Sequence, residues 1–182
     1  MIEFGEFHWQ PDTIGFVDAS FFWGFIITQH LGGIVSTYFS AHLVFGSAIF
    51  FSSIVNFLIP SSTQYNPWAV MVVRFIQGLA DGVTFPATFG ILRCWASPLE
   101  RTSLANLALS GCYVEVGIGT TVSGFLRELL GWDAPYFFYG CSGIIWFMFW
   151  MFLCFEKPSK HQALSPKEQQ YIKKVSSLSD AQ

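Results

Sequence analysis

Long apolar stretches separated by short polar connections dominate the chain. No lysine, arginine, aspartate or glutamate lies between Asp18 and Arg74, and further uncharged runs cover residues 102–114, 116–126 and 134–155. A membrane-spanning helix needs about 20 consecutive, mainly apolar residues. The pattern therefore predicts five membrane spans, at about residues 13–35, 44–59, 71–90, 103–126 and 136–155.

The predicted fold class is an all-α, polytopic transmembrane helical bundle. We expect residues 13–155 to form the five-helix bundle, residues 1–12 to be a luminal or extracellular loop, and residues 156–182 to be a cytoplasmic tail. Within the tail, Ser165 and Glu168 have the spacing of a helix N-cap and its capping box. This pattern predicts a short amphipathic helix on the membrane surface.

The third predicted span is unusual because it contains polar and charged residues at regular intervals. Arg74, Gln77, Asp81, Thr84 and Thr88 recur every three or four positions, so they share one face of a helix. An ionisable residue inside a membrane costs a few kcal/mol and usually marks a binding or translocation site. The alternative is that Arg74 and Asp81 only hold helices together, each paired with a neighbouring residue.

Three small or rigid residues predict how this third span packs. Gly78 and Gly82, four residues apart, allow a neighbouring helix to approach closely. Pro86 is expected to loosen the helix one turn later. Gly111, Gly117, Gly119 and Gly124 suggest close helix contacts for the fourth span as well.

Composition narrows the function classes. The chain of 182 residues is 52% hydrophobic and 12% charged, which is too apolar for an ordinary soluble domain. Its net charge is −3 and its basic residues are scattered, which argues against nucleic acid as a partner. The sequence contains no nucleophile and base pair, phosphate loop or metal cluster, so we expect neither an enzyme nor a cofactor.

The basic residues predict the orientation in the membrane. Five spans place the 93–102 connection and the tail on one side, with seven of the nine lysines and arginines. The other side holds only Arg127, so the tail is expected to be cytoplasmic. An outer N-terminus without a signal peptide suggests that a preceding span is missing.

Several segments resemble one transporter family. FHWQPDTIGFVDASFFWGFIITQ, VRFIQGLADGVTFPA, WASPLER and FYGCSGIIWFMFWMF are similar to the organic-anion and phosphate branch of the major facilitator superfamily. The vesicular glutamate transporters are most similar, with sialin next. The resemblance implies twelve spans in two six-helix halves, of which this chain corresponds to the second through sixth; the first span and the second half are then absent.

The resemblance also implies roles for residues of the third span. Arg74 matches an arginine that helps to bind substrate or chloride, and Asp81 stands where the family has a glutamate implicated in transport and proton coupling. Gln77 and Phe85 complete the expected substrate-binding set.

Two acidic residues depart from the family pattern. Asp18 replaces a histidine, and Glu115 replaces a small residue or glutamine. Counted at 1.5 Å per residue, both lie at a depth similar to that of Arg74. Either carboxylate could therefore pair with Arg74 or take part in ion coupling, and an arginine already paired is a poorer anion site.

The sequence thus favours a secondary transporter of organic anions, glutamate-like or else phosphate or sialic acid, working by alternating access. Its partners would be the lipid bilayer, a proton, sodium or chloride as coupling ion, and the missing transporter half or a related subunit. Expected locations are synaptic or secretory vesicles, lysosomes or the plasma membrane. The alternative is a truncated, transport-incompetent membrane protein that associates with a full-length relative.

Overall fold

The structure, a computed structural model, describes residues 11–96 and 100–154, all of them helical apart from short connections. The expected amphipathic helix of the tail lies outside these residues, as does most of the expected N-terminal loop. The described helices are α1 (Pro11–Tyr38), α2 (Ala41–Tyr65), α3 (Pro67–Asp81), α4 (Thr84–Trp95), α5 (Arg101–Leu130) and α6 (Ala134–Leu153).

The five predicted spans correspond to α1, α2, the pair α3 and α4, α5, and α6. By length and composition, three of these segments can cross a membrane: α2, the continuous 67–95 segment and α6. Helices α1 and α5 are long enough, but neither contains a sufficiently long stretch as apolar as those of the three segments. Their polar side chains need contacts with protein or water rather than lipid.

The predicted end of the second span at about residue 59 is wrong, because α2 continues through Pro60 to Tyr65. A proline inside a helix removes one backbone hydrogen bond. The next turn is stabilised by side chains that bond back to the backbone: Ser62 donates to the Ile59 carbonyl at 2.8 Å, and Thr63 donates to the Pro60 carbonyl at 2.6 Å. These hydroxyl contacts let the helix extend past the proline.

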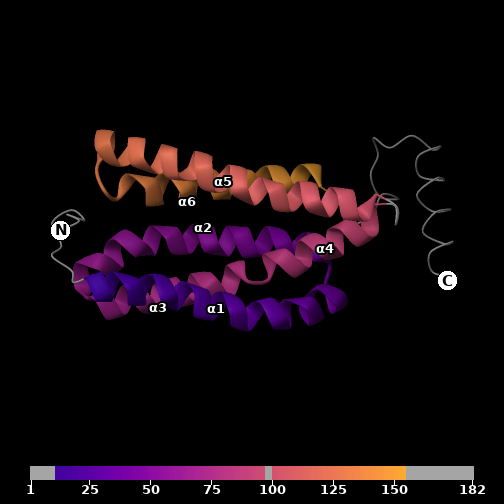
Figure 1. The fold of residues 1–182 in the computed structure, drawn as a ribbon, viewed down its shortest axis with the longest axis horizontal. Helices are drawn as coiled ribbons and strands as arrows, with labels where there is room; N and C mark the ends of the chain where they lie inside the picture. Colours follow the sequence, from indigo (N-terminus) through magenta and orange to yellow (C-terminus); the bar gives the residue numbers. More distant parts are fainter. Residues whose placement is uncertain (1–10, 97–99, 155–182) are drawn as a thin grey trace, which may run out of the picture.

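The expected loosening of the third span by Pro86 is confirmed. Helix α3 ends at Asp81 and α4 begins at Thr84, with a two-residue turn between them. Pro86 has no N–H to donate to the carbonyl of Gly82 four residues earlier, which explains a break at this position. The two helices nevertheless continue in roughly the same direction (Figure 1).

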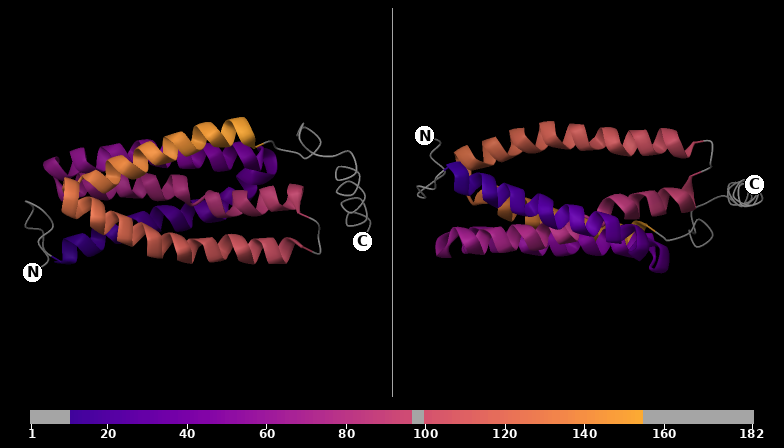
Figure 2. Two further views of the ribbon diagram at one scale, coloured as in Figure 1. Left: turned by 90° about the horizontal axis from the view of Figure 1, so that it is seen from above. Right: turned by 60° about the horizontal axis from the view of Figure 1, so that its bottom comes forward.

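The helices form two layers. Figure 1 shows α5 and α6 along one side and α1 to α4 along the other. Helix α1 packs most extensively against α3, and α2 contacts both α3 and α6. Helix α5 contacts α6 and α4 but has no buried residue, and the views in Figure 2 show it lying apart from α2. One side of α5 therefore faces an open space inside the described bundle.

Glycines bring α1 and α3 into close contact, as predicted for Gly78 and Gly82. A Cβ atom added at Gly78 would overlap the carbonyl oxygen of Phe21, and one added at Gly82 would overlap Thr28. Gly24 makes the reciprocal contact from α1, because its Cβ would overlap the Phe75 carbonyl oxygen. Such backbone contacts fix the rotation of α3 relative to α1.

The glycines of α5 behave differently from the prediction. Within the described part of the chain, Gly111, Gly117 and Gly124 have no neighbouring atom within 4 Å of an added Cβ, and Gly119 has only the Tyr139 hydroxyl at 3.8 Å. The cause is the position of α5, which leaves open space beside these glycines in the described part of the chain.

Gly78→Ala is therefore expected to lower the free energy of unfolding by about 1–3 kcal/mol, because the new methyl group overlaps backbone atoms of α1. The matched control is Gly117→Ala, which adds the same methyl group in open space and should raise stability by up to about 1 kcal/mol through helix propensity. Thermal unfolding in detergent, followed by circular dichroism, measures both changes. Equal effects of the two substitutions would contradict the close contact.

Candidate functional site

Polar side chains on the facing sides of α2 and α3 form one chain of hydrogen bonds. Arg74 Nη1 donates to Gln77 Oε1 at 3.3 Å. Gln77 Nε2 in turn donates to Asn56 Oδ1 at 3.3 Å and to Ser52 Oγ at 3.5 Å. Ser52 Oγ then donates to Asp81 Oδ2 at 3.1 Å. This series of hydrogen bonds thus connects the guanidinium group of Arg74 to the carboxylate of Asp81 through neutral side chains.

The central side chains of this hydrogen-bond network are buried. Gln77 and Ser52 are only 7% and 8% exposed. Arg74 and Asp81 are about 10 Å apart along the helix axis, too far for direct pairing within the helix. The neutral side chains satisfy both ends, and an unsatisfied polar group in this apolar layer would cost several kcal/mol. Gln77 and Asp81 therefore also tie α3 to α2, which is the packing role left open by the sequence.

The guanidinium group of Arg74 lies at the open end of this chain. Its Cζ atom lies 5.8 Å from the centre of the Tyr136 ring, within the range of a cation–π contact. Its Nε atom is buried and has no hydrogen-bond partner among the described residues. Arg74 is thus held from two sides, by Gln77 and by Tyr136, and keeps donor capacity for another group.

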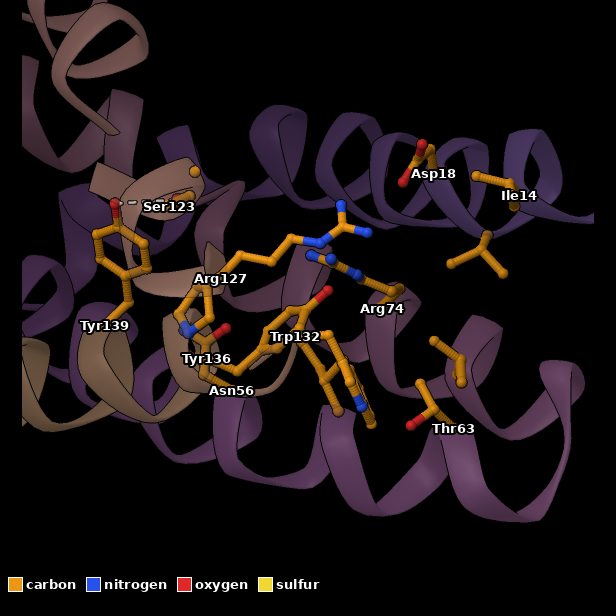
Figure 3. Close-up of a pocket in the computed structure, with 15 residues that line it drawn as sticks. Ile14, Asp18, Asn56, Thr63, Arg74, Ser123, Arg127, Trp132, Tyr136 and Tyr139 are labelled. Carbon is orange, nitrogen blue, oxygen red and sulfur yellow. Dashed lines mark hydrogen bonds between the residues drawn. The ribbon is translucent and has the colours of Figure 1, made fainter. Parts of the chain in front are cut away.

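Arg74 lines a cavity of about 550 Å³ between α1, α2, α3, α5 and α6 (Figure 3). The charged residues on its wall are Arg74, Arg127 and Asp18, and polar groups come from both layers of the fold. The remaining wall consists of Ile14, Val17, Asn56, Ile59, Thr63, Val70, Ser123, Gly124, Trp132, Pro135, Tyr136 and Tyr139. Its volume lies in the usual range for small-molecule sites.

Arg127 was not among the predicted site residues. The predicted fourth span ends at about residue 126, but α5 continues to Leu130 and includes Arg127. The α5–α6 turn closes at Gly131, whose φ of 108° suits only glycine. This turn folds α6 back along α5 and leaves Arg127 on the cavity wall.

Helix α6 helps to hold this part of α5 in place. The Tyr139 hydroxyl donates to the Gly119 carbonyl at 2.9 Å and accepts from Ser123 Oγ at 3.2 Å. The signal for Arg127 in the sequence was its position as the lone basic residue on the predicted outer side.

Among the other predicted site residues, Asp18 lines this cavity, whereas Gln77, Asp81, Phe85 and Glu115 do not. Asp18 lies on its α1 wall, so it shares the site with Arg74 as its depth suggested. Glu115 is exposed on α5 and does not line the cavity. The hydrogen bond of Arg74 goes to Gln77 rather than to either acid. Phe85 packs edge-on against Phe25 of α1 at 5.9 Å between ring centres.

The arrangement can bind an anion. A guanidinium group offers several N–H donors in one plane and grips a carboxylate through two of them. Figure 3 shows Arg74 and Arg127 pointing toward one another inside the cavity.

The fold and this site define a polytopic helical membrane protein with a cationic cavity between its helices. A comparison with protein families matches residues 3–180 to the Major Facilitator Superfamily. The chain therefore belongs to this superfamily of transporters, and it is an integral, multi-pass membrane protein.

Individual proteins that are similar to the chain belong to a narrower group than the superfamily. The chain is 42% identical to vesicular glutamate transporter 3 of Danio rerio over 92% of its length, and 42% identical to human vesicular glutamate transporter 2 over 93%. Vesicular glutamate transporter 1 of Xenopus laevis is also 42% identical, over 94%. The matches cover 28–30% of these relatives, so the chain spans less than a third of their length.

Gln77→Met should destabilise the fold, because it removes the amide that links Arg74, Asn56 and Ser52. Leaving these buried groups unsatisfied is expected to cost about 1–3 kcal/mol. The matched control is Gln64→Met, at an exposed position of α2, which should change stability by less than about 0.5 kcal/mol. Thermal unfolding in detergent compares the two variants. A chain with no network would show the same small change for both.

Proposed function

We propose that the chain forms part of a secondary transporter for organic anions of the glutamate type, with Arg74 binding a substrate carboxylate. The observation that supports this most is the state of Arg74. Its guanidinium lines a cavity, its hydrogen bond goes to a neutral amide, and its Nε has no partner among the described residues. A purely structural arginine in a membrane would be expected to pair with a carboxylate or backbone carbonyl.

The surrounding contacts would orient the arginine for this task. Gln77 fixes one edge of the guanidinium and Tyr136 lies on its face. A cation held in place before the ligand arrives loses little conformational entropy on binding. The planar fork of arginine would then bind a carboxylate through two parallel hydrogen bonds.

The hydrogen-bonded chain offers a route for coupling to an ion. Asp81 accepts from Ser52, which in turn accepts from Gln77, the residue bound to Arg74. A carboxylate at Arg74 would compete for the donors that hold Gln77, and a shift of Gln77 would change the environment of Asp81. We infer that this series of hydrogen bonds lets substrate binding at Arg74 and proton binding at Asp81 affect each other.

Transport requires more than this cavity. Alternating access moves two repeats against each other about a central site. The break between α3 and α4 gives the site helix a point at which it can bend.

The names of the similar proteins favour glutamate over phosphate or sialic acid, and a vesicle over another membrane. Because the chain spans under a third of these relatives, transport is proposed for a protein with both halves.

The test is uptake by a chimera in which residues 7–172 replace the matching segment of a vertebrate vesicular glutamate transporter. Arg74→Ala should abolish uptake of radiolabelled glutamate into liposomes. Arg74→Lys keeps the charge but lacks the fork, and it should raise KM roughly tenfold or more. The matched controls, Arg93→Ala and Arg93→Lys, change an exposed arginine in the last turn of α4 and should leave KM unchanged.

Two results would contradict this function. The first is uptake by both Arg74 variants with the kinetics of the parent chimera, which would make Arg74 structural. The second is equal loss of uptake in the Arg74 and Arg93 variants, which would show that positive charge anywhere on the chain suffices.

A further inference from the structure

The cavity wall carries a side-chain amide beside its charged groups. Asn56 of α2 and Arg74 of α3 both line the cavity (Figure 3). Behind the wall the two residues are joined by Gln77, which is only 7% exposed and does not line the cavity. The sequence pattern favoured Gln77 as the substrate-binding amide, whereas the structure brings the amide of Asn56 to the cavity.

The donor-only character of arginine determines which way both amides point. Arg74 Nη1 can only donate, so the Gln77 atom that lies 3.3 Å from it must be the carbonyl oxygen Oε1. Gln77 Nε2 then faces α2, where its two hydrogens go to Ser52 Oγ at 3.5 Å and to Asn56 Oδ1 at 3.3 Å. Both donors of the Gln77 amide are therefore used, and the oxygen of Asn56 is turned toward Gln77.

The Nδ2 group of Asn56 is the end of this arrangement that has no partner. It carries two N–H donors, and within the described residues Asn56 makes no hydrogen bond other than the one that its oxygen accepts. Asn56 lies inside α2, a helix that is apolar and long enough to cross a membrane. Lipid offers no acceptor to an amide at such a depth, so the acceptor must lie in protein or in a cavity. Because Asn56 lines the cavity, a molecule bound there can supply it.

We propose that Asn56 is a second binding residue of the anion site, whose Nδ2 group donates a hydrogen bond to a carboxylate oxygen of the ligand held by Arg74. The proposal rests on the proposed function, since Arg74 is taken to hold that ligand. It adds a neutral donor from α2 to the charged donor from α3. The ligand then contacts two helices that are already linked to each other through Gln77.

A neutral donor suits this position in an apolar layer. Arg74 supplies the positive charge, and a hydrogen bond from an amide to a carboxylate adds affinity and direction without burying a further charge. The Asn56 amide is oriented before the ligand arrives, because Gln77 holds its oxygen. A donor that is already oriented loses little conformational entropy on binding. An asparagine that only held Gln77 would use its oxygen alone, and its Nδ2 group would contact no ligand.

The direct test uses the 182-residue chain in liposomes, with isotopically labelled asparagine and arginine and with glutamate labelled in both carboxylates. The chain has three asparagines, Asn56, Asn66 and Asn106, so the side-chain amide signals are few. Solid-state nuclear magnetic resonance should show dipolar coupling between a carboxylate carbon and Asn56 Nδ2, because a hydrogen bond places these atoms about 4 Å apart. Asn56→Asp removes one amide signal and so assigns it. Asn66 and Asn106 do not line the cavity and should show no coupling.

Isothermal titration calorimetry with glutamate measures how much Asn56 contributes to binding. Asn56→Ala should raise the Kd roughly tenfold or more, because a hydrogen bond to a charged group is lost. Asn56→Asp keeps an oxygen that can accept from Gln77 but has no N–H to donate, and it should raise the Kd at least as much. The matched control is Asn106→Asp, the same change at an exposed position of α5, which should leave the Kd unchanged.

The outcomes distinguish this proposal from the one on which it rests. Coupling of glutamate to both Arg74 and Asn56 in the parent chain supports the role of Asn56, and this measurement needs no substitution that could disturb folding. Coupling to Arg74 without coupling to Asn56, or a Kd that Asn56→Ala leaves unchanged, would make Asn56 structural and leave the anion site at Arg74 standing. If glutamate couples to neither residue, both proposals are wrong.

Discussion

The structure depends on holding a charged guanidinium group within an apolar layer. Arg74 cannot hydrogen-bond to lipid, and removing a charged group from water is expensive. Neutral polar groups surround the arginine instead. Gln77 accepts a hydrogen bond from it, and Ser52 and Asn56 of α2 accept hydrogen bonds from Gln77. Because these partners are neutral, the charge of Arg74 is stabilised without being cancelled. It stays able to attract an anion.

The packing of the helices serves this requirement. Close contact through Gly24 and Gly78 sets the rotation of α3, so that its polar face meets α2. Once that face is fixed, the first turns of α3 place Arg74 at the cavity, and the α5–α6 turn at Gly131 adds Arg127 from the other layer. The site is thus formed by helices whose positions are determined largely by contacts outside the cavity.

The sequence predicts features that arise within one helix and misses those that depend on rotation between helices. The polar face of Arg74 and the break near Pro86 follow from spacing and from the missing N–H of proline. Ser52 shows no such pattern, because Ser47, Ser52 and Ser53 lie on different sides of α2 and do not mark one face. Counting residues gave Glu115 a depth but could not place it around the helix axis, and it does not line the cavity. Arg127 was missed because α5 runs four residues beyond its apolar stretch.

The central claim is that a substrate carboxylate contacts the Arg74 guanidinium. The most direct measurement is a solid-state nuclear magnetic resonance experiment on the chain in liposomes, with isotopically labelled arginine and glutamate labelled in both carboxylates. The chain has four arginines, so few nitrogen signals overlap. The account predicts that dipolar coupling joins a bound carboxylate carbon to guanidinium nitrogen, and that Arg74→Lys removes this coupling while Arg93→Lys does not. Coupling that is unchanged in Arg74→Lys would contradict the account.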